Sequence, residues 1–256
     1  MSSNFLLQDK KTIIINLLFS FIIFSFIIGN LILNLNVVLL IIVSFIFYKK
    51  KLIYQNLNNI DKLIICFFLY ILVSSFYNNI YYLINNETNN YNIILKSLFY
   101  LRFLLLYLVV KFLIKENIIN LKYFLVFSLI ATLFVSFDVI FQLIYGYDIF
   151  GFEANPRRLS GPFGDELVAG SYLQRFGLFA LFFIPIFLKF KSQRSSLLIT
   201  LFLFLLILFS MIIAGNRVPL TFFFLSIFFI LLLEKKLRKF LIIFILVFFG
   251  LTFTIF

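Results

Sequence analysis

The chain has 256 residues, of which 64% are hydrophobic, and its mean hydropathy of +1.14 excludes an ordinary soluble domain, in which apolar residues make up about 45–50%. The formal net charge is +12, but the basic residues are spread over short segments between apolar runs, which excludes a nucleic-acid-binding face. Cys66 is the only cysteine, so neither a disulfide nor a thiolate metal site can form within the chain.

Nine apolar runs reach or approach the ~20 residues that cross a bilayer. They cover 13–28, 31–47, 63–77, 97–114, 121–145, 166–188, 195–214, 218–233 and 240–256. We therefore expect an all-α, polytopic transmembrane helix bundle of about nine helices. It forms a single membrane-embedded domain over 1–256, with an outer loop at about 145–165. The first run continues directly into the second without a cleavage site, so we expect it to be retained as an anchor.

Most basic residues lie in alternate connecting segments, which the positive-inside rule places in the cytoplasm. They are Lys10, Lys11, Lys49, Lys50, Lys51, Lys62, Lys111, Lys115, Lys122, Lys189, Lys191, Arg194, Lys235, Lys236, Arg238 and Lys239. This pattern predicts a cytoplasmic N-terminus and attraction to anionic membrane lipid. Five arginines lie instead toward the outer side, against the trend, which indicates a specific role for them: Arg102, Arg157, Arg158, Arg175 and Arg217.

Two opposite charges lie inside consecutive predicted helices. We expect Arg102 and Asp138 at matching depth, each about 9 Å below the outer surface. They form either a structural ion pair or part of a cavity in which Arg102 meets an anionic ligand. Gln142 follows Asp138 by four residues and extends the same polar face toward the outer loop.

The outer loop ends in a tight turn at Gly161-Pro162 and Gly164. We expect Asp165 to cap the next helix and Glu166 to complement its positive end. Alternatively, one of these carboxylates orients an arginine or accepts a proton from an attacking hydroxyl. The small residues at 169–171 favour a close helix contact.

A second outer motif reads Ala214-Gly215-Asn216-Arg217. It is either a glycine turn with a snorkelling arginine, or a group of backbone N–H donors beside a guanidinium that suits phosphate.

These motifs together resemble those of the O-antigen ligase and O-antigen polymerase superfamily of bacterial envelope proteins. The resemblance rests on F-D-x-x-F-Q at 137–142, R-L-S-G-P-F-G-D-E-L-V-A-G-S-Y-L at 158–173 and G-N-R at 215–217. It implies an inner-membrane glycosyltransferase that needs no metal or other cofactor. Its donor is an undecaprenyl-diphosphate-linked saccharide at the periplasmic face, and its acceptor is a lipid A core sugar or a second lipid-linked glycan.

The resemblance also implies the residues that hold the diphosphate. Arg158 and Arg217 match the family's arginines, and Arg175 and Arg102 are plausible companions, while Asp138, Gln142, Asp165 and Glu166 support them. No catalytic base is assigned. A transporter or lipid-linked oligosaccharide flippase is the alternative class, and a purely structural membrane subunit the third.

The chain departs from the family in its C-terminal part. Relatives usually carry more helices and a large late loop with a histidine, whereas this chain has no histidine and ends within its last apolar run. We therefore expect the chain to be incomplete at its C-terminus and impaired in activity by itself.

The charge pattern predicts the side of the membrane on which each connecting segment lies. Single cysteines in a Cys66→Ser background, labelled from outside intact cells, test this. We expect labelling at the extracytoplasmic positions and not at the cytoplasmic ones. The first set is Asn89, Arg158 and Asn216, and the second is Lys50, Lys115, Lys191 and Lys236. Labelling of position 158 only after permeabilisation would reverse the orientation.

Overall fold

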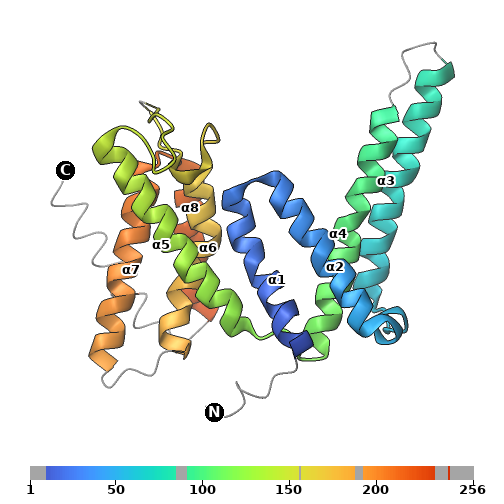
Figure 1. Cartoon of the computed structure of the whole chain (residues 1–256), viewed down its shortest axis with the longest axis horizontal. Coiled ribbons are helices and arrows are strands. Elements are labelled where there is room, and N and C mark those ends of the chain that lie inside the picture. The colour runs from blue at the N-terminus through green and yellow to red at the C-terminus, as the bar shows by residue number, and fades with distance from the viewer. Residues whose placement is uncertain (1–9, 85–90, 156, 188–192, 234–241, 243–256) are drawn as a thin grey trace. The chain divides into compact units, whose positions relative to one another are not determined.

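The computed structural model describes residues 10–84, 91–155, 157–187, 193–233 and 242. These residues form eight α-helices and one 3-10 turn (Figure 1). The helices are α1 (Lys10–Ile28), α2 (Asn30–Ile53), α3 (Asn59–Ile84), α4 (Tyr91–Lys115), α5 (Leu121–Tyr145), α6 (Ala169–Phe187), α7 (Gln193–Ile213) and α8 (Arg217–Leu233), and the 3-10 turn η1 is Gly161–Phe163.

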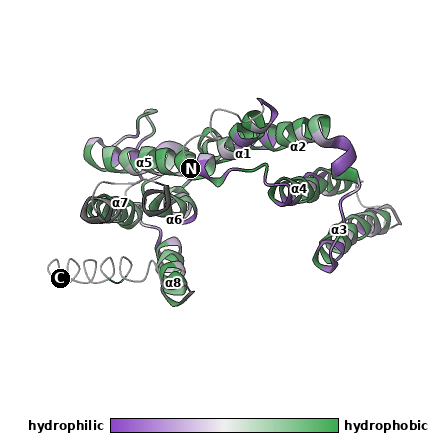
Figure 2. Cartoon of the chain, turned by 90° about the horizontal axis from the view of Figure 1, so that it is seen from below, coloured by the Kyte–Doolittle hydropathy of each residue, from purple (hydrophilic) through white to green (hydrophobic). Residues whose placement is uncertain are grey.

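The predicted all-α architecture is confirmed, and each of the first eight apolar runs lies wholly or mostly in one of the eight helices. The ninth run, 240–256, lies outside the described residues apart from Ile242. Five helices, α1 to α5, are long and apolar enough to cross a membrane, and α7 and α8 contain shorter apolar stretches. Figure 2 shows apolar residues along all the labelled helices. This is the pattern of a multi-pass membrane protein.

Two predicted helix starts are wrong. The fourth helix begins at Tyr91 rather than at residue 97, so residues 91–96 belong to the helix and not to the connecting loop. The sixth begins at Ala169 rather than Glu166, so Asp165 does not cap it, and its first turn holds no acidic residue. The reason is local: Glu166 N–H donates to the Phe163 carbonyl and Val168 N–H to the Glu166 carbonyl, which keeps 165–168 in turns.

The helices form two compact units. The first comprises Met1–Ile22 and Leu31–Asn120, and the second Ile23–Asn30 and Leu121–Phe256. The core of the first unit is formed by apolar residues of α1, α2 and α4, among them Ile15, Leu40 and Leu113, which are fully buried. Two buried amides strengthen it: Asn16 donates to the Ile118 carbonyl at 3.0 Å, and Asn36 donates to the Leu18 carbonyl at 3.1 Å.

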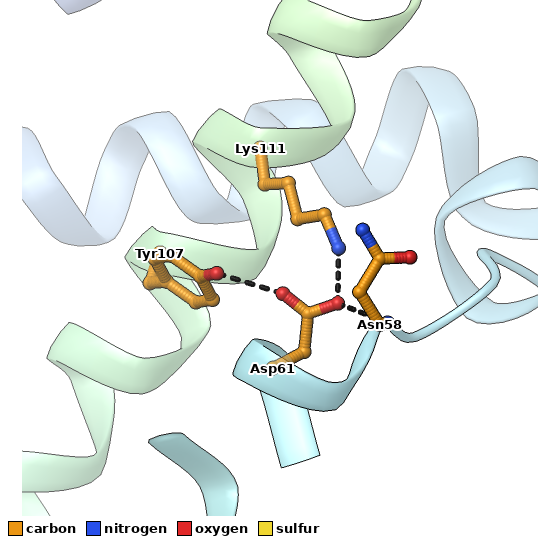
Figure 3. Close-up of polar contacts among 4 residues, drawn as sticks. All are labelled: Asn58, Asp61, Tyr107 and Lys111. Atoms are coloured by element: carbon orange, nitrogen blue, oxygen red, sulfur yellow. Dashed lines mark hydrogen bonds and ion pairs between the residues drawn. The ribbon is translucent and has the colours of Figure 1, made fainter. Parts of the chain in front are cut away.

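Helix α3 packs along α4 and is fastened to it by a polar cluster (Figure 3). The Asp61 carboxylate, whose side chain is only 1% exposed, accepts hydrogen bonds from Tyr107 Oη at 2.7 Å and from Lys111 Nζ of α4. Asp61 Oδ2 also accepts the backbone N–H of Asn58 at 2.5 Å. That bond ties the first turn of α3 to the residue before it, as the acidic residue of a capping box does. One carboxylate therefore caps α3 and joins it to α4.

The second unit is built around α5, α6, α7 and α8, which share one apolar core. Side-chain hydroxyls cross between its helices: Ser128 Oγ donates to the Phe176 carbonyl at 3.1 Å, and Ser210 Oγ to the Ser136 carbonyl at 3.2 Å. The end of α1 belongs to this unit, because Tyr172 Oη donates to the Ile23 carbonyl at 3.0 Å. These contacts join α5 to α6, α5 to α7, and the end of α1 to α6.

The buried cluster at Asp61 should contribute far more to stability than an exposed ion pair. We expect Asp61→Asn to lower the free energy of unfolding clearly, because it removes the charge that accepts from Lys111, but by less than the loss of a fully buried pair would, since the Lys111 side chain keeps 22% exposure. The matched control is Glu116→Gln, which breaks the exposed 3.3 Å pair with Lys51 and should change stability by less than about 1 kcal/mol. Denaturant titration in detergent micelles measures both, and equal effects would contradict the assignment.

Candidate functional site

The loop between α5 and α6 is folded back onto the end of α5 by Gln142. This side chain is fully buried; its Oε1 accepts the backbone N–H of Gly161 at 2.9 Å, and its Nε2 lies 3.3 Å from Ser160 Oγ and 3.5 Å from the Phe152 carbonyl. Gln142 thus faces the loop, on the same side of α5 as Asp138, while its role in supporting a diphosphate site stays a prediction. One amide thus joins two distant parts of the loop to α5.

Two aspartates hold the first part of the loop. Asp138 Oδ1 accepts the backbone N–H of Ile149 at 2.9 Å. Asp148 Oδ1 accepts the N–H groups of Phe150 and Phe152 at 3.0 and 2.7 Å, which closes a tight turn. Both aspartates are fully buried, and the Oδ2 atom of each has no hydrogen-bond partner among the described residues. Asp148 was missed in the sequence, although an aspartate two residues before Phe150-Gly151 is a usual signal of an Asx turn.

The expected tight turn at Gly161-Pro162 is confirmed as the 3-10 turn η1. Gly161 and Gly164 both have positive φ, of 55° and 61°. A Cβ on Gly161 would also lie 2.8 Å from Val139 of α5, so the backbone approaches α5 more closely than any other residue would allow. The turn therefore rests directly on the helix that carries Asp138 and Gln142.

The arginine segment of the loop lies against the turn between α7 and α8. Gly215 has φ of +71°, and a Cβ there would lie 2.8 Å from the Arg157 carbonyl and 3.2 Å from Arg158 Cγ. Two residues later Arg217 begins α8, and the side chains of both Arg158 and Arg217 are exposed. The structure therefore brings together the two segments that hold the sequence-predicted phosphate ligands.

Small residues make a second contact between the same parts of the chain. Asn216 is buried and its Nδ2 donates to the Leu167 carbonyl at 3.2 Å. A Cβ on Gly170 would lie 2.7 Å from Asn216 Cβ, so α6 does make a close contact at 169–171, but its partner there is the turn before α8 rather than another helix. Arg175 lies about one and a half turns beyond Gly170 on α6, and its side chain is exposed.

Arg102 belongs to the first unit, and Asp138 to the second, so their pairing stays a prediction. Arg102 Nε is buried without a hydrogen-bond partner among the described residues, and the guanidinium carbon lies 4.9 Å from the centre of the Phe103 ring. Because α4 begins at Tyr91, Arg102 is roughly 16 Å along the helix from its start, whereas Asp138 is about 10 Å from the end of α5. Counted from the helix ends, Arg102 lies deeper than expected.

An apolar cavity of ≈ 440 Å³ opens beside the loop. Its walls are residues 26–30, where α1 ends and α2 begins, and loop residues that include Phe150, Phe152 and Phe163. Glu166 is its one acidic lining residue. None of Arg158, Arg175 and Arg217 lines this cavity, and Asp165 is exposed outside it. Of the two neighbouring carboxylates, Glu166 is the one that faces a space where a ligand fits.

Among the described residues, no three His, Cys, Asp or Glu side chains gather closely enough to hold a metal ion. Comparisons with protein-family models, with curated proteins and with solved structures find no match for the chain.

The local stability of the folded loop should depend on Gln142 more than on any exposed neighbouring side chain. Replacing Gln142 with Leu removes the acceptor of the buried Gly161 N–H, which should cost about 1–3 kcal/mol locally. We expect amide hydrogen exchange in peptides covering 146–164 to accelerate by roughly 5- to 100-fold. Leu143→Ala, at a side chain that is 52% exposed on the next position of α5, is the control and should leave exchange unchanged. Unaltered exchange in the Gln142→Leu variant would remove Gln142 from this role.

Proposed function

We propose that the protein is an integral-membrane glycosyltransferase of the O-antigen ligase and polymerase type. It acts at the outer face of the bacterial inner membrane, with its N-terminus in the cytoplasm. The observation that carries this proposal is the contact of the Arg157–Arg158 segment with Gly215, two residues before Arg217. Two of the three motifs on which the family resemblance rests adjoin, although Arg158 and Arg217 lie more than 50 residues apart in the sequence. Their exposed arginines are free to bind one anionic group.

The proposed donor is an undecaprenyl-diphosphate-linked saccharide. Arginine suits a diphosphate because its planar guanidinium donates two parallel hydrogen bonds to phosphate oxygens. Arg158 and Arg217 would hold the diphosphate, with Arg175 of the same unit as a companion. The apolar cavity beside the loop offers a place for an apolar part of a substrate. Pro162 and Phe163 of the 3-10 turn η1 are among its lining residues.

The proposed reaction transfers the saccharide to a hydroxyl of a lipid A core sugar or of a second lipid-linked glycan. The hydroxyl oxygen bonds to the anomeric carbon, the bond from that carbon to the diphosphate oxygen breaks, and the hydroxyl proton leaves to a base. Negative charge collects on the departing diphosphate, where the guanidinium groups stabilise it. Glu166 is the better placed of the two loop carboxylates to orient the acceptor or take its proton, since it lines the cavity.

A transporter or lipid-linked oligosaccharide flippase is the second candidate, and the position of Arg102 favours it. A charged side chain near the middle of a membrane helix, with a buried Nε that lacks a partner among the described residues, is typical of a residue that lines a substrate pathway. Reconstituted vesicles distinguish the two classes. A flippase moves a labelled lipid-linked saccharide between leaflets, whereas a transferase joins it to an acceptor.

The proposed diphosphate site predicts that arginine and lysine at position 217 bind the diphosphate with different affinity, although both carry one positive charge. We expect Arg217→Lys to weaken the binding of undecaprenyl diphosphate to the purified chain by about tenfold, because lysine keeps the charge but not the paired hydrogen bonds. Lys50→Arg, a charge-conserving exchange at the end of α2, should leave the dissociation constant unchanged. Equal affinity of Arg217→Lys and the parent chain would mean that Arg217 only snorkels at the helix end.

A further inference from the structure

A second apolar groove runs along one face of α4 and has a volume of ≈ 480 Å³. The residues that line it recur at helical spacing on this face: Phe103, Leu106, Tyr107, Val110, Lys111 and Ile114. From Phe103 to Ile114 the helix rises by roughly 16 Å, which is close to the ~15 Å thickness of one hydrocarbon leaflet. The groove therefore has the length of a lipid chain.

The groove is apolar except near the end of α4, where Lys111 lines it. Asp61 holds the Lys111 ammonium from one side, and Tyr107 Oη bonds the same carboxylate. An ammonium group has three donors, so the bond to Asp61 orients Lys111 and leaves donors for a second acceptor. The groove thus combines an apolar helix face with a positioned cation near one end.

The charges around this end are predominantly positive. Lys115 lies one turn beyond Lys111 on the same face of α4 and is exposed, as is Lys62 beside Asp61. Asp61 neutralises one of these three lysines, and Glu116 pairs with Lys51 instead. An occupant must therefore bring an apolar chain for the groove and a negative group for the helix end, which are the two parts of an anionic phospholipid.

We propose that α4 carries a binding site for an anionic phospholipid. One acyl chain lies in the groove between Phe103 and Ile114, and the phosphate contacts Lys111 and Lys115. The site uses none of the residues of the proposed diphosphate site, so it stands or falls independently of the proposed glycosyl transfer.

A tryptophan reporter tests this site, because the natural chain contains no tryptophan. The full chain with Phe103→Trp is reconstituted into phosphatidylcholine vesicles. These contain a minor fraction of brominated phosphatidylglycerol or the same fraction of brominated phosphatidylcholine, which quench tryptophan on contact. We expect phosphatidylglycerol to occupy the site preferentially, by roughly fivefold for each lysine that contacts the head group. A Phe67→Trp reporter, on α3 at a side chain that is 54% exposed, should show no preference.

Two variants test whether the preference for phosphatidylglycerol depends on Lys111 and Lys115. Lys115→Gln should reduce it by about fivefold, while Lys10→Gln, at the exposed start of α1, should leave it unchanged. Lys111→Gln alone would leave the buried Asp61 carboxylate without its ion-pair partner. The double variant Asp61→Asn/Lys111→Gln is therefore used to remove Lys111. It keeps a polar pair at the cluster and should lower the preference in the same way. Equal quenching of the Phe103→Trp reporter by the two lipids, or a preference that survives both the Lys115 variant and the double variant, would overturn the proposal.

Discussion

A backbone N–H or C=O group without a hydrogen-bond partner costs several kcal/mol in hydrocarbon, and the structure of this chain depends on that cost. Helices satisfy their own backbone groups, so each of the first eight apolar runs is wholly or mostly helical. The segment between α5 and α6 is the main departure. There the side chains of α5 replace the missing backbone partners, with Gln142 accepting from Gly161 and Asp138 from Ile149. The loop that carries the candidate site can leave helical structure because α5 provides its acceptors.

Polar side chains serve a second purpose where helices meet. In lipid the apolar faces of two helices gain little by association, so hydrogen bonds and close packing determine which helices pair. The Asp61 cluster joins α3 to α4, and the Ser128 and Ser210 hydroxyls join helices of the second unit. Gly170 and Gly215 act by size, since a side chain at either would collide with its neighbour. The close approaches at Gly170 and Gly215 bring the two arginine-bearing segments of the second unit together.

The two proposed ligand sites differ in the cation that each uses. Exposed arginines at 158 and 217 suit a diphosphate that must be held in a fixed orientation, because guanidinium donates in pairs. Lysines at the end of α4 suit a lipid head group that exchanges with the bilayer, because an ammonium group is a compact charge with freely rotating donors. In the first case neighbouring glycines allow the segments to approach, and in the second Asp61 orients one lysine.

The sequence by itself determined the class and the approximate spans, because a run of apolar residues long enough to cross hydrocarbon has only one stable backbone conformation there. It also indicated the tight turn at Gly161 and the close contact at Gly170, since both depend on residues with little or no side chain. It did not determine where α4 and α6 begin: residues 91–96 join α4, whereas local backbone hydrogen bonds keep residues 165–168 out of α6. The roles of Asp61, Asp138 and Asp148 were likewise decided only by tertiary structure. A carboxylate accepts any nearby donor, and the fold, rather than the spacing along the chain, places Lys111 beside Asp61 and the loop N–H groups beside Asp138 and Asp148.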